Sequence, residues 1–164
     1  MNIQKLKEGI ALHKTNSPKT YDEDINITVP LLLLNRKMLD GISNILVKKY
    51  SIASAELDVL VSLLIGGKDD FTLSPTELYD RLIFSSSGMS KVIKRLNDKE
   101  YIVRIDNPED RRSKLVKLTI KGRELLDVAL KDLVKYECEY FKNFTKDEKN
   151  TFSKLLFKSL QGME

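Results

Sequence analysis

Apolar residues recur at helical spacing along most of the chain, and this pattern predicts its elements. Between about residues 29 and 49 they fall three or four positions apart, which predicts one long helix. Pro30 is expected in its first turn, where a proline is tolerated. A second helix is predicted from Ser54, a suitable N-cap, to the Gly66–Gly67 pair that would end it.

Two short helices are expected next. Ser74, Pro75 and Glu77 have the spacing of a capping box with proline at the first helical position, so a helix should run from here to about Leu82. Ser85 is the expected N-cap of another helix. Its apolar residues recur at i, i+3, i+4 and i+7 and are Met89, Val92, Ile93 and Leu96. Two short helices joined by about four residues form a helix-turn-helix pattern.

A strand-like pattern then replaces the helical spacing. Residues 101–105 and 114–118 are rich in β-branched and aliphatic residues, and each run is short enough for a strand. Asn107-Pro108 opens a turn between them. Together these runs predict a β-hairpin directly after the helix-turn-helix.

The two ends of the chain are predicted to be helical. Residues 1–24 are expected to form an arm with a short helix, which Ser17-Pro18 and the acidic run behind it would end. Thr119 is the expected cap of a long helix reaching about residue 143, and Thr145 that of a last helix. The predicted fold is therefore mostly α with a small β-hairpin.

Composition narrows the class of protein. The chain has 164 residues, of which 41% are hydrophobic and 32% charged, which suits a single compact domain. Its longest apolar run, residues 29–34, is far shorter than the ~18–20 residues of a membrane span. The first twenty residues have no hydrophobic signal core, so a cytoplasmic location is expected. The only cysteine, Cys138, excludes an intramolecular disulfide and a cysteine-cluster zinc site.

Positive charge is concentrated in one part of the chain. Between Arg81 and Arg123 there are 12 Lys and Arg against 5 Asp and Glu, whereas the remainder carries 16 against 19. Clustered basic residues are typical of a site for a polyanion, although a solvated surface is their commoner meaning. The cluster coincides with the predicted helix-turn-helix and hairpin, which favours nucleic acid as the polyanion.

The second short helix has an outer face suited to DNA. With its apolar stripe turned inward, that face would carry Ser86, Ser87, Ser90, Lys91 and Lys94. Small hydroxyl side chains allow close approach to base edges, and lysines bind phosphates. Gly88 in the first turn would cost up to ~1 kcal/mol of helix stability. That cost fits a close approach of DNA, but a neutral glycine fits equally well.

The hairpin tip carries Arg111 and Arg112. Arginine is the side chain best suited to a narrow, electronegative minor groove. Asp110 stands two residues before Arg112 and is expected to pair with it and orient the guanidinium, unless it only neutralises the loop. Arg112 is therefore the expected groove reader, while Arg111 could face phosphate or solvent.

Two stretches resemble the winged helix-turn-helix of MarR-family transcriptional regulators. "SKVIKRLNDKEYIVR", residues 90–104, is similar to the family's recognition helix and first wing strand. "DRRSKLVKLTIKG", residues 110–122, is similar to its wing followed by Leu-Thr-x-x-Gly. On this resemblance the wing arginine falls on Arg112 and its aspartate on Asp110. The family usually has glycine where this chain has Glu100, so the helix end there is either strained or different.

The resemblance extends over about residues 25–162 and implies an organisation. Residues 51–118 would form the DNA-binding domain, and residues 25–50 and 119–164 a helical dimerisation region. A homodimer would bind a pseudo-palindromic operator in double-stranded DNA, most often as a repressor, and a small aromatic or anionic effector could release it. The interface candidates are Phe141, Phe144, Phe152, Leu155, Leu156, Phe157 and Leu160, which could instead fill an intrachain core.

Other classes of function have less support in the sequence. No clustered catalytic residues, phosphate-binding glycine loop or cofactor motif is recognisable, so neither an enzyme nor a cofactor is expected. A winged-helix module that binds protein rather than DNA is the remaining alternative. Glu137 and Glu139 flank Cys138 and disfavour a thiolate, so it is interpreted as an inert helix cysteine rather than a redox sensor. His13, the only histidine, is assigned no role, and no metal site is expected.

Overall fold

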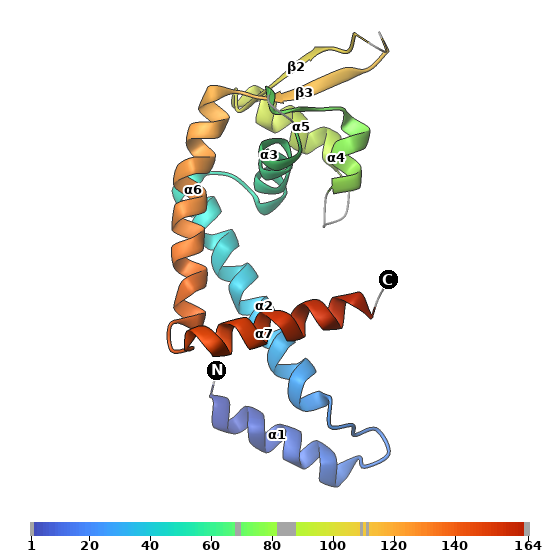
Figure 1. The fold of residues 1–164 in the computed structure, drawn as a ribbon, viewed down its shortest axis with the longest axis vertical. Helices are drawn as coiled ribbons and strands as arrows, with labels where there is room; N and C mark the ends of the chain where they lie inside the picture. Colours follow the sequence, from blue (N-terminus) through green and yellow to red (C-terminus); the bar gives the residue numbers. More distant parts are fainter. Residues whose placement is uncertain (1, 68–69, 82–87, 109, 111, 163–164) are drawn as a thin grey trace. The chain divides into compact units, whose positions relative to one another are not determined.

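A computed structural model provides the structure, which describes residues 2–67, 70–81, 88–108, 110 and 112–162. The described chain divides into two compact units, Met1–Gly41 and Ile42–Glu164. The elements, in order, are α1 (Ile3–Asn16), α2 (Ile25–Ile45), the π-helix η1 (Leu46–Tyr50), α3 (Ser54–Gly66), β1 (Thr72–Leu73), α4 (Pro75–Arg81), α5 (Met89–Asp98), β2 (Ile102–Asp106), β3 (Lys114–Leu118), α6 (Ile120–Cys138), the 3₁₀ turn η3 (Glu139–Phe141) and α7 (Lys146–Gln161) (Figure 1). The fold is thus mostly helical with a small antiparallel sheet, as predicted. Within the described ranges, no helix combines the length and apolar character needed to cross a bilayer.

The first unit contains α1 and most of α2. The predicted arm helix is present as α1, capped by the Asn2 side chain, which accepts from the Gln4 N–H at 2.9 Å. The long helix begins earlier than predicted, at Ile25, so Pro30 lies inside it rather than in its first turn. Asp22 explains the earlier start, since its carboxylate accepts from the Asp24 N–H at 2.9 Å and a negative charge stabilises a helix N-terminus.

The second unit is built around α3. Leu60 and Leu63 of this helix are fully buried, together with Leu46, Leu96 and Leu126 from the elements around it. Figure 1 shows α3 beneath the sheet, with α6 on one side and α4 and α5 on the other. The predicted end of α3 at Gly66 is confirmed, but its predicted cap is wrong. The N-cap is Ala53, whose N–H is satisfied by the Glu56 carboxylate at 2.7 Å.

The sheet has the strand order β1–β3–β2. The predicted hairpin is present as β2 and β3, paired antiparallel with Ile102 opposite Leu118 and Asp106 opposite Lys114. β1 was not predicted, because two residues are too short to show an alternation. The hairpin extends well beyond the helices (Figure 1), so its far end is free to reach a partner.

Three of the predicted helix caps are confirmed. The Ser74 hydroxyl accepts from the Glu77 N–H, and the Glu77 carboxylate accepts from the Ser74 N–H. Thr119 accepts from the Gly122 N–H at 3.0 Å, and Thr145 forms a capping box with Glu148. The last two caps set where α6 and α7 begin. α6 ends at Cys138 instead of about residue 143, and the chain continues through η3.

The junction between α5, the hairpin and α6 explains two details of the sequence. Glu100 has φ +62°. The Glu100 N–H bonds to the Asn97 carbonyl and the Tyr101 N–H to that of Leu96, which together form a Schellman motif. Glu100 therefore occupies the left-handed position that favours glycine, and it pairs with Lys121 at 2.8 Å. Position 122 requires glycine, because a Cβ there would lie only 2.2 Å from the Tyr101 carbonyl oxygen.

Candidate nucleic-acid interface

The inner face of α5 packs into the second unit. Met89, Val92, Ile93 and Leu96 are all buried, as the stripe predicted. Because these four residues fix the rotation of the helix about its axis, Ser90, Lys91 and Lys94 are exposed on the opposite side. The helix therefore presents a short polar and basic face to solvent.

The start of α5 differs from the prediction. Its first residue is Met89 and its N-cap is Gly88, so Gly88 is not in the first turn. Gly88 has φ +93°, and a Cβ there would meet nothing within 4 Å. The backbone conformation thus explains the glycine without any need for a nearby partner. The predicted cap Ser85 and the candidate contacts Ser86 and Ser87 lie outside the described residues.

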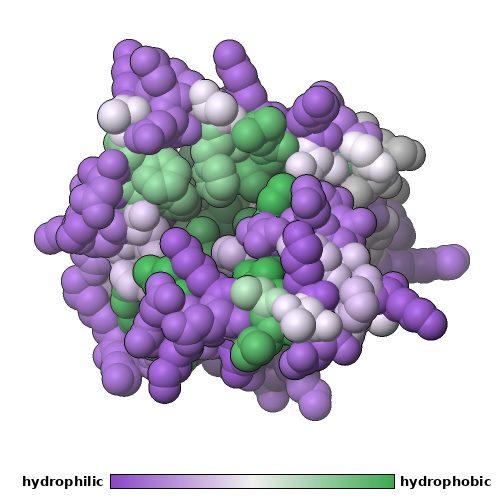
Figure 2. All heavy atoms as spheres, turned by 90° about the horizontal axis from the view of Figure 1, so that it is seen from below, coloured by the Kyte–Doolittle hydropathy of each residue, from purple (hydrophilic) through white to green (hydrophobic). Residues whose placement is uncertain are grey.

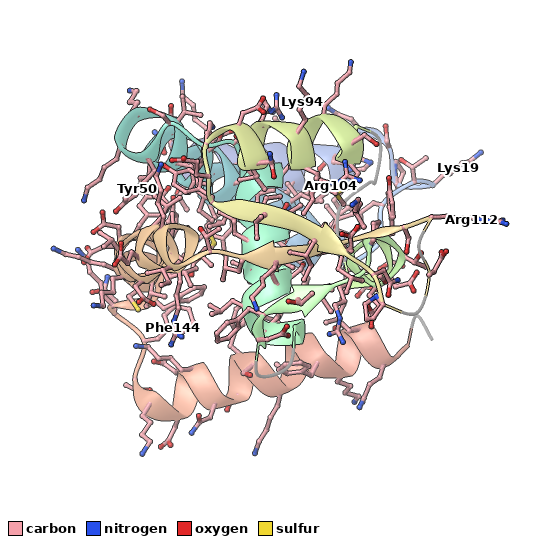
Figure 3. All side chains as sticks on the ribbon, turned by 90° about the horizontal axis from the view of Figure 1, so that it is seen from above. Lys19, Tyr50, Lys94, Arg104, Arg112 and Phe144 are labelled. Atoms are coloured by element: carbon pink, nitrogen blue, oxygen red, sulfur yellow. The ribbon has the colours of Figure 1, made fainter. Side chains whose placement is uncertain are left out.

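The lysines of α5 carry uncompensated charge. Within the part of the chain that the structure describes, no carboxylate forms an ion pair with Lys91 or Lys94. Figure 3 shows Lys94 projecting from the outer side of the helix. Both ammonium groups are therefore available to an anion from outside.

The tip of the hairpin is organised by Asp110, but not in the way predicted. Its carboxylate accepts from the backbone N–H of Arg112 at 2.9 Å, and its carbonyl from the Ser113 N–H at 3.0 Å. No ion pair joins Asp110 to the guanidinium of Arg112 in the described structure. Asp110 thus fixes the turn, and the Arg112 side chain extends outward from its end (Figure 3). Arg111 lies outside the described residues.

Arg104 is a candidate that sequence reasoning missed. It lies on β2 opposite Val116 and on the same face of the sheet as the buried Ile102, yet it is itself exposed. Figure 3 shows it on β2, between the labelled Lys94 and Arg112. No local signal marks it, because the alternation of β2 places Arg104 on the same face as the buried Ile102.

Two other hairpin cations are compensated. Lys114 forms an ion pair with Asp106, and the Lys117 ammonium lies 3.6 Å from the Asp70 carboxylate. The pKa of Asp70 is held below its usual value by the hydrogen bond from the Thr72 hydroxyl and then by Lys117. The basic face of this unit thus combines paired lysines on β3 with the unpaired Lys94 and Arg112.

The predicted interface residues lie in η3, in the turn after it and along α7. Phe141, Phe144 and Phe152 contact one another, with ring centroids 5.7 to 6.0 Å apart. Leu155, Leu156, Phe157 and Leu160 are exposed within the chain. An open groove of about 550 Å³ runs beside them and is lined by Cys138, Phe141 and Phe157 among others. Figure 2 shows apolar side chains reaching the surface on the face seen from below.

The potential metal ligands among the described residues are dispersed. Among the described side chains, no three His, Cys, Asp or Glu gather closely enough to hold a metal ion. Cys138, the single cysteine, is a free and exposed thiol.

Comparison with known proteins assigns this arrangement to a family. Residues 50–113, from the end of η1 to the hairpin tip, match the model of the MarR family. The winged helix-turn-helix of this chain is that of the MarR family. The MarR-family match spans α3, α4 and α5, the strand β2 and the wing tip.

Relatives of known class extend the match beyond the winged domain. The chain is 27% identical to the HTH-type transcriptional regulator PrsX of Escherichia coli over 165 residues, 100% of this chain and 98% of PrsX. A mutant of E. coli MarR solved in complex with operator DNA is 28% identical over 85% of this chain and 99% of its own, with a TM-score of 0.66. BpsR of Bordetella bronchiseptica, whose DNA binding is regulated by 6-hydroxynicotinic acid, shares the fold at 21% identity, with a TM-score of 0.69 over 85% and 96% of the two chains. The relatives that this chain resembles are transcriptional regulators, and one similar structure contains operator DNA, which together support a DNA-binding regulator.

Proposed function

We propose that this chain binds double-stranded operator DNA as a homodimer and represses transcription. The observation that carries the proposal is the unpaired basic face of α5 beside a hairpin that ends in an extended arginine. An α-helix fits the major groove, and an arginine on an adjacent hairpin fits the minor groove. The protein thus reads one half-site with two elements of a single winged unit.

Each candidate residue has a role in this proposal. Ser90, together with Ser86 and Ser87, approaches base edges or phosphates through its hydroxyl. Lys91 and Lys94 neutralise phosphates, as Arg111 does at the hairpin tip. Arg112 enters the minor groove. Asp110 supports it indirectly, because its carboxylate accepts a hydrogen bond of 2.9 Å from the backbone N–H of Arg112 and so fixes the turn.

Dimerisation is proposed to involve the apolar face of α7. Within the chain, 67% of Phe157 and 59% of Leu160 remain exposed, and apolar surface of this kind is stabilised when a partner covers it. A second copy presents the same surface, so a two-fold interface can be self-complementary. The two recognition helices of such a dimer would then read half-sites about one helical turn apart.

A small aromatic or anionic effector is proposed to release the DNA. An open groove of about 500 Å³ lies between the end of α2, η1 and α6. Its lining includes three lysines, one tyrosine and two carboxylates, of which Asp132 pairs with Lys49: Lys48, Lys49, Lys135, Tyr136, Asp132 and Glu139. Lysines and an aromatic ring suit an aromatic carboxylate. The ligand works only if it binds more tightly to the DNA-free arrangement of the two winged units than to the bound one.

DNA retained by the purified protein tests the binding proposal. Fragments of genomic DNA that the protein retains are sequenced, and the enriched site is then titrated at several salt concentrations. A reader contacting roughly 6–10 phosphates loses about 10³- to 10⁵-fold in affinity between 50 and 200 mM salt. A pseudo-palindromic site with this salt dependence is the expected result. A protein with no affinity for any duplex would instead be a winged-helix module that binds protein.

The effector is tested on the same duplex with 6-hydroxynicotinic acid as the probe. Release of DNA at concentrations that leave the protein folded is expected, and Lys49→Met should weaken that response. Release that is equal in the wild type and the variant would rule out this groove as the site.

A further inference from the structure

Lys99 joins two segments that are distant in the sequence. It is the C-cap of α5, and its ammonium donates to the Glu56 carboxylate at 2.9 Å and to the Ser51 carbonyl at 2.8 Å. The first partner belongs to α3, and the second follows η1. One side chain therefore connects the end of the proposed recognition helix to the point where α2 and η1 lead into α3.

Glu56 gives this contact its strength. Only 4% of its side chain is exposed, and a buried carboxylate is costly unless it is paired and hydrogen-bonded. One of its oxygens accepts from Lys99 and the other from the Ala53 N–H at 2.7 Å. The Arg95 guanidinium is more distant, with Nε at 3.9 Å. Lys99 is therefore the principal counter-charge of Glu56 among the described residues.

Ser51 is held in place by the turn that it ends. It has φ +55° in the left-handed region, and its N–H bonds to the Val47 carbonyl at 3.2 Å. The conformation turns the chain out of η1 and leaves the Ser51 carbonyl to accept from Lys99. A movement of η1 consequently moves an acceptor of Lys99.

The residue before Ser51 ties the same segment to α6. The Tyr50 hydroxyl donates to the Asp132 carboxylate at 2.6 Å, and Lys49 pairs with the same carboxylate. The hydrogen bonds from Lys49 and Tyr50 hold the pKa of Asp132 below its usual value, so the carboxylate is charged at neutral pH. Polar contacts thus run from α6 through η1 to the end of α5.

We propose that Lys99 is a positioning residue for DNA binding, which fixes the direction of α5 relative to the junction of η1 and α6. This inference rests on the proposed function, since it assumes that α5 reads DNA and that α6 leads to a dimer interface. The apolar face of α5 holds the helix by non-directional contacts, whereas the two hydrogen bonds of Lys99 are directional. In a dimer, the direction of α5 sets the distance between the two half-sites that can be read together.

The test compares half-site spacing in Lys99→Met and the wild type. Methionine keeps the length and apolar stem of the side chain but cannot donate to Glu56 or Ser51. Lys99→Arg is the conservative variant, and Lys131→Met, an exposed lysine of α6, controls for the loss of one charge. Affinity is measured for duplexes with one half-site and for duplexes with two half-sites whose spacer is varied by one or two base pairs.

The expected result is a change in spacing preference. Lys99→Met should lose roughly 3- to 30-fold in affinity at the natural spacing and much less on altered spacings or a single half-site. Lys99→Arg and Lys131→Met should keep the preference of the wild type. An equal loss on every duplex would show a purely structural role and overturn the proposal, as would no loss at all. A wild type without duplex affinity would instead refute the proposed function itself.

Two further variants keep the test valid if Lys99→Met fails to fold. Glu56→Gln retains an acceptor for the Ala53 N–H but removes the charge that Lys99 pairs with, and it should shift the spacing preference in the same way. Asp132→Asn weakens the tie between η1 and α6. Its effect should be smaller in a Glu56→Gln background than in the wild type, because both changes act on one chain of contacts. Full additivity of the two effects would contradict that chain.

Discussion

Leu60 of α3 and Phe157 of α7 are both large apolar residues on helices of the second unit, yet their surroundings are opposite. Leu60 is fully buried, whereas 67% of Phe157 is exposed. α3 is enclosed by the sheet, α5 and α6, while no described residue of α7 is buried. The chain thus completes the core of its winged domain by itself, whereas it leaves the apolar face of α7 exposed.

Because one region is buried and the other exposed, they should stabilise different things: the fold of each chain, and the association of two chains. Burial of a side chain such as Leu60 contributes to the free energy of unfolding of each chain. The exposed face of α7 can contribute only when two chains meet, so its effect should depend on protein concentration. Substitutions in the two regions should therefore be distinguishable by the measurement that detects them.

The largest effect is expected at the centre of the winged domain. Leu60→Ala should lower the free energy of unfolding by about 2–5 kcal/mol, because it leaves a cavity in a closed core. Ile65→Ala on the same helix, where 76% of the side chain is exposed, should change it by less than about 0.5 kcal/mol. Urea denaturation measures both, and similar losses for the two variants would contradict the assigned core.

The next effect concerns association. Phe157→Ala should weaken the dimer by about 2 kcal/mol or more, the size typical of an interface hot spot, while the far-UV circular dichroism stays unchanged. Lys158→Ala, its neighbour on α7, is the matched control. Sedimentation equilibrium gives the dissociation constant. An unchanged constant for Phe157→Ala would place the interface elsewhere.

A smaller effect is expected at the hairpin tip. Arg112→Ala should reduce the affinity for the operator by roughly 1–3 kcal/mol and alter neither the dimer nor the stability, since its side chain extends from the tip. Titration by fluorescence anisotropy measures this loss, with Lys131→Ala as a control distant from the hairpin in sequence. Unchanged DNA affinity would remove Arg112 from the interface.

Glu100 should show a small effect of opposite sign. Glu100→Gly relieves the left-handed conformation at φ +62° and should raise the free energy of unfolding by about 0.5–1 kcal/mol. The lost pair with Lys121 is exposed and offsets little of this gain. Glu100→Ala, which loses the pair but keeps the strain, should be less stable than either. Thermal denaturation ranks the three proteins.

The smallest effect is expected from the N-terminal arm. Removal of residues 1–20 should leave the melting temperature and the DNA affinity of the remaining chain unchanged, because the winged domain lies in a separate compact unit. Differential scanning calorimetry and the operator titration check this. A large loss of stability would show that α1 belongs to the association surface.

Local signals in the sequence were sufficient for most of the fold. The apolar stripe of α5 and the caps at Ser74, Thr119 and Thr145 depend on neighbours within a few residues, and all of them are confirmed. The predictions failed where neighbouring residues offer more than one candidate contact. Glu56, held by Lys99, replaces Ser54 as the determinant of the start of α3.

The candidate site was predictable to a similar extent. Periodicity alone placed Lys91 and Lys94 on the outer face of α5, and the structure agrees. Sequence could not show that Asp110 bonds to a backbone N–H rather than to the guanidinium, because both partners lie two residues away. It also could not reveal Arg104, whose relevance depends on which strand pairs with which.

Cys138 offers a practical use that follows from its position. It is the only cysteine of the chain, its thiol is exposed, and it lines the groove beside Phe141 and Phe157. A fluorophore coupled to this one thiol would sit where two copies are proposed to meet, without any engineered attachment point. The native protein therefore carries its own label site for following subunit exchange in real time.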